Sequence, residues 1–198
     1  MSDPALLPLS ADEVARLVAT RRDLHAHPEL AYGETRTAGL VSERLGALGY
    51  TLQTGIAETG IVARLPAKRP GKTLLLRADM DALPIQEASQ HAYASQTAGV
   101  MHACGHDGHV AALLTTAERL AKADLVGELV LCFQPAEEGR GGAEAMIAAG
   151  ILAGVDAVCG VHLWNSLPVG AIGLASGPVM AAVDRFEVVL RGQGGHGA

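Results

Sequence analysis

Three short apolar runs, separated by helical patterns, constrain the fold of this 198-residue chain more than any other feature. The runs are residues 72–77 (KTLLLR), 128–133 (ELVLCF) and 157–163 (AVCGVHL). Apolar runs of about four to eight residues are typical of buried strands. Because these runs alternate with helical segments, we expect a layered α/β sheet.

Capping residues and apolar spacing place the other elements. Ser10 and Glu13 match a capping box at the start of a helix, and Pro28 ends that helix. The remaining expected elements are helices at 35–48, 107–123 and 141–149, and strands within 51–65, at 170–175 and at 184–191. The glycine-rich segment after residue 191 leads into no further element, so we expect the chain to stop inside a structural unit.

Composition narrows the classes of function. Hydrophobic residues make up 49% of the chain and charged residues 18%, which is typical of a globular protein. A net charge of -6 makes nucleic acid an unexpected partner. No apolar stretch approaches the ~20 residues that span a membrane, and we expect neither a membrane partner nor a signal peptide.

The cysteines indicate the redox environment. Cys104, Cys132 and Cys159 are odd in number and widely spaced, which argues against a disulfide framework. We therefore expect a reducing, cytoplasmic location. Cys132 and Cys159 lie inside predicted strands and are expected in the core.

The segment from His102 to Ala111 (HACGHDGHVA) carries the most distinctive chemistry. Cys104 and His106 flank a glycine directly before a predicted helix. The dipole at the N-terminus of that helix would help to keep the Cys104 thiolate ionised.

Further polar side chains stand at the ends of the predicted strands, where sites form in open α/β sheets. They are Asp79 and Asp81 after 72–77, Glu137 and Glu138 after 128–133, and His162 at the end of 157–163. We expect them to converge with Cys104 and His106. The ordinary alternatives are a solvated glutamate pair and a histidine satisfied within the core.

A thiolate, two imidazoles and two adjacent carboxylates can hold a transition metal and still leave one carboxylate as a base. Neighbouring side chains diverge, so one of Glu137 and Glu138 can bind metal while the other moves the proton. A thiolate ligand favours zinc, nickel or cobalt over magnesium, and manganese is kept as an alternative metal.

These motifs, together with residues 22–30, 76–85 and 194–198, resemble the metal-dependent amidohydrolases of the aminoacylase and carboxypeptidase superfamily. The similarity is greatest to the branch of hippurate hydrolase and the indole-acetyl-amino acid hydrolases. It implies a three-layer α/β/α, zinc-exopeptidase-like catalytic domain, interrupted by an α+β lid domain that forms a homodimer. Residues 1–183 would belong to the catalytic domain, and 184–198 would be the first strand of the lid.

The resemblance also implies roles and cofactors. It implies two divalent metal ions (Zn, Mn, Ni or Co), with Cys104 between them. The implied roles are metal ligation by Cys104, His106, Glu138 and His162, general base catalysis by Glu137, ligand orientation by Asp81, and substrate binding in the lid by His196. Asp79 stands where many relatives outside this branch have a metal-binding histidine.

The resemblance therefore implies metal-dependent hydrolysis of the amide bond of a small-molecule N-acyl amino acid. A dipeptidase or carboxypeptidase of the same superfamily is the alternative enzyme, and a truncated, inactive product is the non-enzymatic one. Members of the family are about twice as long and carry a last histidine ligand near their C-terminus. We accordingly expect the 198-residue chain alone to be inactive.

Overall fold

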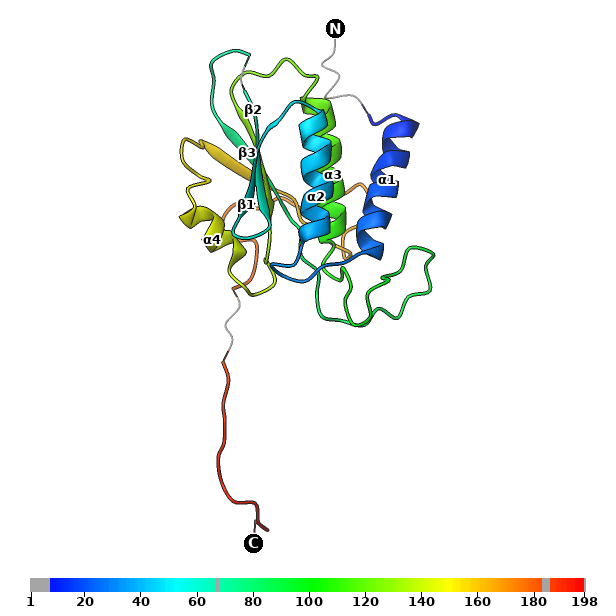
Figure 1. Cartoon of the computed structure of the whole chain (residues 1–198), viewed down its shortest axis with the longest axis vertical. Helices are drawn as coiled ribbons and strands as arrows, with labels where there is room; N and C mark the ends of the chain where they lie inside the picture. The colour runs from blue at the N-terminus through cyan, green and yellow to red at the C-terminus, as the bar shows by residue number, and fades with distance from the viewer. Residues whose placement is uncertain (1–7, 67, 183–185, 198) are drawn as a thin grey trace. The chain divides into compact units, whose positions relative to one another are not determined.

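The computed structural model describes residues 8–66, 68–182 and 186–197. The chain divides into two units, Met1–Leu163 and Trp164–Ala198. The helices and strands of the described residues all lie in the first unit (Figure 1). In chain order they are α1 (Ala11–Ala26), α2 (Thr35–Ala47), β1 (Thr51–Ile56), β2 (Gly60–Leu65), β3 (Leu74–Asp79), α3 (His106–Leu120), β4 (Leu129–Gln134), α4 (Gly142–Ala148) and β5 (Ala157–Gly160).

The five strands form one mixed sheet in the order β1-β2-β4-β3-β5. β2 pairs antiparallel with both β1 and β4, whereas β3 pairs parallel with both β4 and β5. Asp79 lies opposite Gln134, and Gly160 lies opposite Arg77. The carboxyl ends of three neighbouring parallel strands therefore meet at one edge of the sheet, where sites form in such folds.

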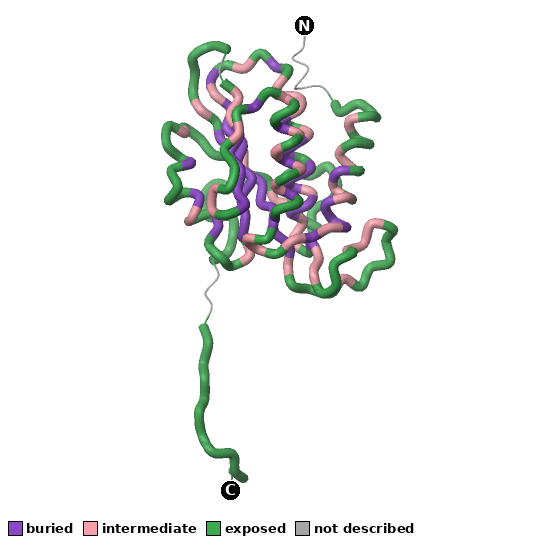
Figure 2. The backbone as a smooth tube through the Cα atoms, in the orientation of Figure 1, coloured by how far each residue is buried: buried purple, intermediate pink, exposed green. Residues whose placement is uncertain are grey.

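Helices cover both faces of the sheet, with α1, α2 and α3 on one side and α4 on the other (Figure 1). The larger core cluster joins the three helices to the sheet through residues such as Leu24, Val41 and Leu114. The smaller cluster packs Met146 of α4 against Val62, Leu75, Val130 and Cys132. The buried residues in Figure 2 accordingly follow the strands and the helix faces turned toward them. The predicted α/β class is confirmed, with a sheet of mixed strand direction.

Local sequence explains where the helices begin. Ser10 and Glu13 form the predicted capping box at the start of α1: the Ser10 N–H donates to Glu13 Oε2 over 2.7 Å, and the Glu13 N–H to Ser10 Oγ over 3.3 Å. α3 follows Gly105, which adopts a φ of 89°. A side chain is strained at that φ, so glycine allows the chain to turn sharply between Cys104 and His106.

Three predictions near the C-terminal end were wrong. Residues 170–175 and the described residues of 184–191 form no strand, and β5 ends at Gly160 rather than at residue 163. Residues 183–185 lie outside the described residues. Alternating apolar residues form a strand only where a partner strand supplies hydrogen bonds, and no strand among the described residues pairs with these segments.

Cys159 corrects a further expectation. It is exposed rather than buried, because β5 lies at the edge of the sheet and, among the described residues, pairs with β3 alone. Cys132 is buried, as expected, because β4 lies inside the sheet.

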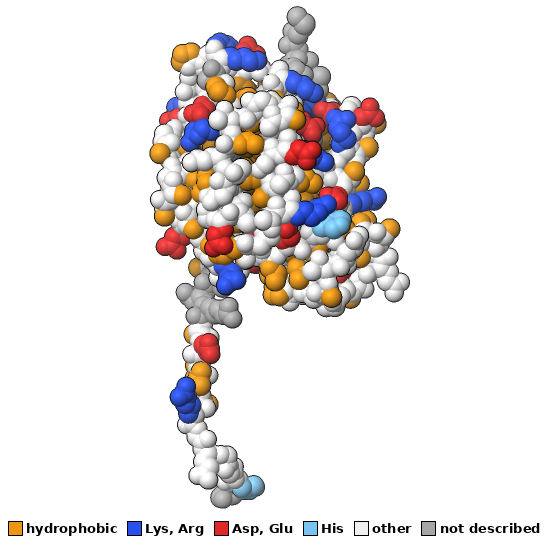
Figure 3. Space-filling model, in the orientation of Figure 1, with side chains coloured by type: hydrophobic (Ala, Val, Ile, Leu, Met, Phe, Trp, Pro, Cys, Tyr) orange, Lys and Arg blue, Asp and Glu red, His pale blue; other side chains and the backbone are white. Residues whose placement is uncertain are grey.

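The surface and the helices bear on possible partners. On the face of the molecule shown in Figure 3, acidic and basic side chains are interspersed over the first unit. No helix among the described residues has the length and apolar character needed to cross a membrane.

Candidate metal centre

Four of the predicted ligands meet beyond the carboxyl ends of β3, β4 and β5. Ligand atoms of Cys104, His106 and His162 all lie within 4.8 Å of one another. Cys104 Sγ is 3.4 Å from His162 Nε2, and His106 Nε2 is 3.9 Å from Glu138 Oε1. The structure thus brings the four side chains together, and their role as ligands stays a prediction.

His106 is held with one ring nitrogen facing this cluster. Its Nδ1 donates to the backbone carbonyl oxygen of Asp81 over 2.8 Å, which leaves Nε2 as the acceptor nitrogen. Nε2 is buried and has no hydrogen-bond partner among the described residues. Burial lowers the pKa of His106, but the carboxylates of Asp81 and Asp79 outweigh it and raise the pKa. The surroundings therefore favour a positive charge at this point.

The two adjacent glutamates differ in their settings. Glu138 Oε1 is buried without a hydrogen-bond partner in the described part of the chain, and the Glu138 N–H donates to Asp81 Oδ2 over 2.9 Å. Glu137 Oε2 lies 3.9 Å from His106 Nε2, and 41% of the Glu137 side chain is exposed. Burial and the charges of Asp79 and Glu138 raise the pKa of Glu137. A carboxyl group so placed can take up a proton and give it back.

The surroundings of Cys104 disfavour its thiolate form, contrary to expectation. Burial, followed by the neighbouring carboxylate of Glu138, raises the pKa of the Cys104 thiol to about 12. These effects exceed the stabilisation that the α3 dipole provides. A cation bound between the thiol and the carboxylates would reverse the balance and displace the thiol proton.

Sequence reasoning missed His109, which is buried beside the cluster. Its Nδ1 lies 2.6 Å from Asp79 Oδ1, and its Nε2 accepts a hydrogen bond from the Leu163 N–H over 2.9 Å. Both ring nitrogens are thus engaged, so His109 acts here as a support rather than as a ligand. Its position three residues after His106, on the same helix face, was the available sequence signal.

The support extends to His162 and to Arg77. His162 Nδ1 donates to the carbonyl oxygen of Leu163 over 2.7 Å, which leaves Nε2 toward Cys104. Arg77 Nη1 lies 2.7 Å from Asp79 Oδ2. Burial raises the pKa of Asp79, but the hydrogen bond from His109 and the charge of Arg77 outweigh it and bring that pKa to about 2. Asp79 therefore holds His109 as an ionised carboxylate.

A second buried network holds the first turn of α3. His25 Nδ1 and Arg21 Nε, both from α1, lie 2.7 Å and 2.8 Å from Asp107 Oδ2. Because Asp107 follows His106 directly, the network fixes the helix start that presents His106. His25 thus supports the candidate centre from α1.

The donor set fits a divalent transition metal. Three candidate groups share His106: one with Cys104 and His162, one with Asp79 and His109, and one with Glu137 and Glu138. This set of a thiol, imidazoles and carboxylates suits zinc-like ions better than magnesium. Two of its buried atoms, His106 Nε2 and Glu138 Oε1, lack hydrogen-bond partners within the described part of the chain.

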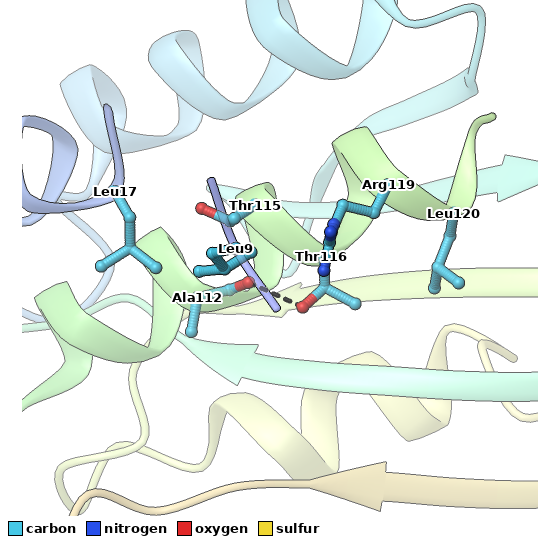
Figure 4. Close-up of a pocket in the computed structure, with 7 residues that line it drawn as sticks. All are labelled: Leu9, Leu17, Ala112, Thr115, Thr116, Arg119 and Leu120. Atoms are coloured by element: carbon cyan, nitrogen blue, oxygen red, sulfur yellow. Dashed lines mark hydrogen bonds between the residues drawn. The ribbon is translucent and has the colours of Figure 1, made fainter. Parts of the chain in front are cut away.

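His196 and a cavity among the described residues are separate features of the chain. His196 belongs to the second unit and is exposed there. A cavity of about 310 Å³ lies between α1 and α3 (Figure 4). Its lining offers no carboxylate, thiol or imidazole and consists of Leu9, Leu17, Ala112, Thr115, Thr116, Arg119 and Leu120.

The domain is thus a mixed α/β sheet with possible metal ligands gathered at its carboxyl edge. The model of peptidase family M20/M25/M40 matches residues 75–194, and the chain belongs to this family.

Relatives of known name agree with this assignment. The chain is 48% identical to an N-acyl-L-amino acid amidohydrolase of Geobacillus stearothermophilus, over 96% of this chain and 54% of the relative. It is 42% identical to hippurate hydrolase of Campylobacter jejuni, over 98% of this chain and 51% of that protein. It is also 49% identical to thermostable carboxypeptidase 2 of Saccharolobus solfataricus, over 92% of this chain and 48% of that protein.

A solved structure matches the fold. The YXEP protein of Bacillus subtilis, described as a dinuclear metal-binding peptidase, matches with a TM-score of 0.82 and 40% identity. The match covers 86% of this chain and 48% of that chain. The chain thus spans about half the length of the relatives it matches.

Proposed function

We propose that this chain carries the metal centre and the general base of an amidohydrolase that cleaves the amide bond of N-acyl amino acids. One observation carries the proposal: His106 Nε2 and Glu138 Oε1 are buried, have no hydrogen-bond partner among the residues that the structure describes, and face each other beside Cys104 and His162. Buried polar atoms in native proteins are nearly always paired, so a bound cation best explains both.

Cys104, His106, Glu138 and His162 would hold the metal, and the YXEP relative supports two ions. When bound, divalent ions of this kind supply a water of lowered pKa and a polarised carbonyl. Asp81 orients His106 through its backbone carbonyl and Glu138 through its carboxylate. His109 and Asp79 secure the chain directly after His162.

Glu137 would move the proton. Its carboxylate accepts a proton from the attacking water, whose oxygen then bonds to the carbonyl carbon of the substrate. Glu137 returns the proton to the leaving nitrogen as the carbon–nitrogen bond breaks, which yields a carboxylic acid and a free amine. Its raised pKa suits this return step, because a carboxyl group that holds its proton more tightly is available as an acid nearer neutral pH.

The substrate class rests on the relatives. The names N-acyl-L-amino acid amidohydrolase and hippurate hydrolase support an acyl amino acid, and the carboxypeptidase name supports the alternative of a peptide with a free C-terminus. The resemblance further supports a homodimer formed through a lid domain that begins at residue 184, in which His196 steadies the developing oxyanion.

The test is a substrate panel on the intact protein. Amine release from N-benzoylglycine, several N-acetyl amino acids and unblocked dipeptides is measured after chelation and again after zinc, manganese, cobalt or nickel is added. We expect metal-dependent hydrolysis of the acyl amino acids. Cleavage of the dipeptides alone would favour the carboxypeptidase alternative, and turnover that survives full chelation would contradict the proposal.

A further inference from the structure

Glu34 is a fully buried carboxylate outside the candidate metal centre. Its Oε1 accepts a hydrogen bond from the Ala136 N–H over 2.9 Å, across 102 residues of sequence. Its Oε2 accepts one from the Thr59 hydroxyl over 2.5 Å. The residue thereby joins the start of α2, the turn between β1 and β2, and the turn after β4.

The hydrogen bond from the Ala136 N–H to Glu34 is made where the backbone has an unfavourable conformation. Ala136 has a φ of 52°, in the left-handed region that non-glycine residues seldom adopt, and it directly precedes Glu137. The Ala136 carbonyl oxygen accepts a hydrogen bond from the Gly142 N–H over 3.1 Å. A Cβ at Gly142 would lie 1.8 Å from the Pro135 carbonyl oxygen, so this return of the chain requires glycine. Contacts with other segments therefore hold the turn of Glu137 and Glu138 in a backbone conformation that its own residues disfavour.

Tyr32, two residues before Glu34, contacts the other end of the turn that carries Glu137 and Glu138. The Tyr32 hydroxyl donates to the Arg140 carbonyl oxygen over 2.8 Å. Tyr32 and Glu34 thus bracket Glu137 and Glu138, one contact just before the pair and one just after it.

The capping of α2 shows that Glu34 does not serve its own helix. Glu34 occupies the N-cap position, yet its side chain makes no capping hydrogen bond. Glu29 does so instead, since its two carboxylate oxygens accept from the Arg36 and Thr37 N–H groups, each over 2.8 Å. A capping carboxylate at the N-cap usually stabilises its own helix. Here Glu29 caps α2, and the side chain of Glu34 instead accepts a hydrogen bond from the turn after β4.

We propose that Glu34 is a positioning residue that fixes the backbone of the turn carrying Glu137 and Glu138, with Tyr32 securing the far end of the turn. The inference rests on the proposed function, in which Glu137 moves the proton. A reacting group displaced by about 1 Å can lose about 10²-fold in rate, so a hydrogen bond at the adjacent residue bears directly on turnover.

The test compares Glu34→Leu, which removes the acceptor, with Glu34→Gln, whose amide oxygen can still accept from the Ala136 N–H. Thr59→Val is the matched control, because it removes only the other partner of Glu34. Hydrogen exchange of the Ala136 amide is followed by NMR, and kcat, KM and metal content are measured on the intact protein.

For Glu34→Leu we expect faster exchange at Ala136 and a loss of about 10²-fold in kcat, with KM close to wild type. Glu34→Gln and Thr59→Val should keep slow exchange and most of the kcat. Unchanged exchange and kcat in Glu34→Leu would overturn the proposal. An equal loss in Glu34→Gln and Glu34→Leu would also overturn it, because it would indicate a merely structural role.

The exchange measurement separates this inference from the proposed function. A wild-type protein that hydrolyses no acyl amino acid would contradict the proposed function. In that case, slow exchange at Ala136 that is lost in Glu34→Leu alone would still support the positioning role, and exchange that is fast already in the wild type would overturn it.

Discussion

His106 Nδ1 lies 2.8 Å from the backbone carbonyl oxygen of Asp81, and this hydrogen bond decides which ring nitrogen faces the candidate metal centre. A histidine that ligates a metal commonly donates its other nitrogen to a carbonyl or a carboxylate. The carboxylate of Asp81 also accepts from the Glu138 N–H. One residue at the end of β3 therefore orients groups from two other segments.

Substitutions of the adjacent Glu137 and Glu138 should affect different properties, namely the rate and the metal content. Glu137→Gln should keep the bound metal and lose ~10²–10⁴ in kcat, because it removes only the proton acceptor. Glu138→Gln should instead lose metal, since its buried Oε1 faces His106 Nε2. Elemental analysis and kinetics on both variants check this. Equal metal loss in the two variants would contradict the division of roles.

His109→Phe should weaken metal binding by ~10–100-fold, the usual scale for residues that orient ligands. The variant removes the acceptor for the Leu163 N–H and the partner of Asp79. His91→Phe is the control, because His91 is exposed and stacks on Tyr93. Competition with a chromogenic chelator gives the affinities. A metal affinity equal to that of the wild type in His109→Phe would contradict the supporting role of His109.

Metal binding should release protons. The pKa of Cys104 is raised to about 12, so the free thiol is protonated across neutral pH and must lose its proton to ligate. We expect about one proton released from Cys104 for each ion bound there, and an affinity that rises about tenfold per pH unit. Calorimetry in buffers of different ionisation enthalpy counts the protons. Cys104→Ser should remove this contribution, and a proton count equal to that of the wild type would contradict the assignment.

Asp79 should contribute to stability in a defined pH range. Its pKa is lowered from 3.8 to about 2, so its ionised form stabilises the fold above about pH 4, and this contribution is lost as the pH falls through about 2. The contribution is about 2 kcal/mol at neutral pH. Asp79→Asn should therefore be less stable than wild type at neutral pH, and the gap should close toward pH 2. A gap that stays constant in acid urea titrations would contradict this.

Sequence patterns predicted the layered α/β sheet because β3 and β4 are covered on both faces, and such strands leave a continuous apolar run. They failed after residue 160, because edge strands and unpaired segments depend on partners that the sequence alone does not reveal. Cys159 shows the same limit: its neighbours are apolar, yet its strand has one partner.

The candidate centre shows a similar division. Cys104, His106, Glu138 and His162 could be predicted because their residue types and strand-end positions carry the chemistry. The spacing from His106 marked His109 as a candidate, but the supporting roles of Glu34 and His109 could not be predicted, because they depend on backbone N–H groups at Ala136 and Leu163 that are distant in sequence. The ionised state of the Cys104 thiol was wrongly predicted because folding buries the thiol and brings carboxylates beside it, and both effects raise its pKa.

The metal content of Cys104→Ala tests the central claim most directly. The wild type and the variant are loaded with cobalt, dialysed and examined by elemental analysis and by the absorption of the cobalt–thiolate bond. Cys159→Ala is the matched control, since Cys159 is exposed on β5. The proposed centre predicts bound cobalt with a thiolate band in the wild type and in Cys159→Ala, and the loss of both in Cys104→Ala. Unchanged cobalt content and an unchanged band in Cys104→Ala would contradict it.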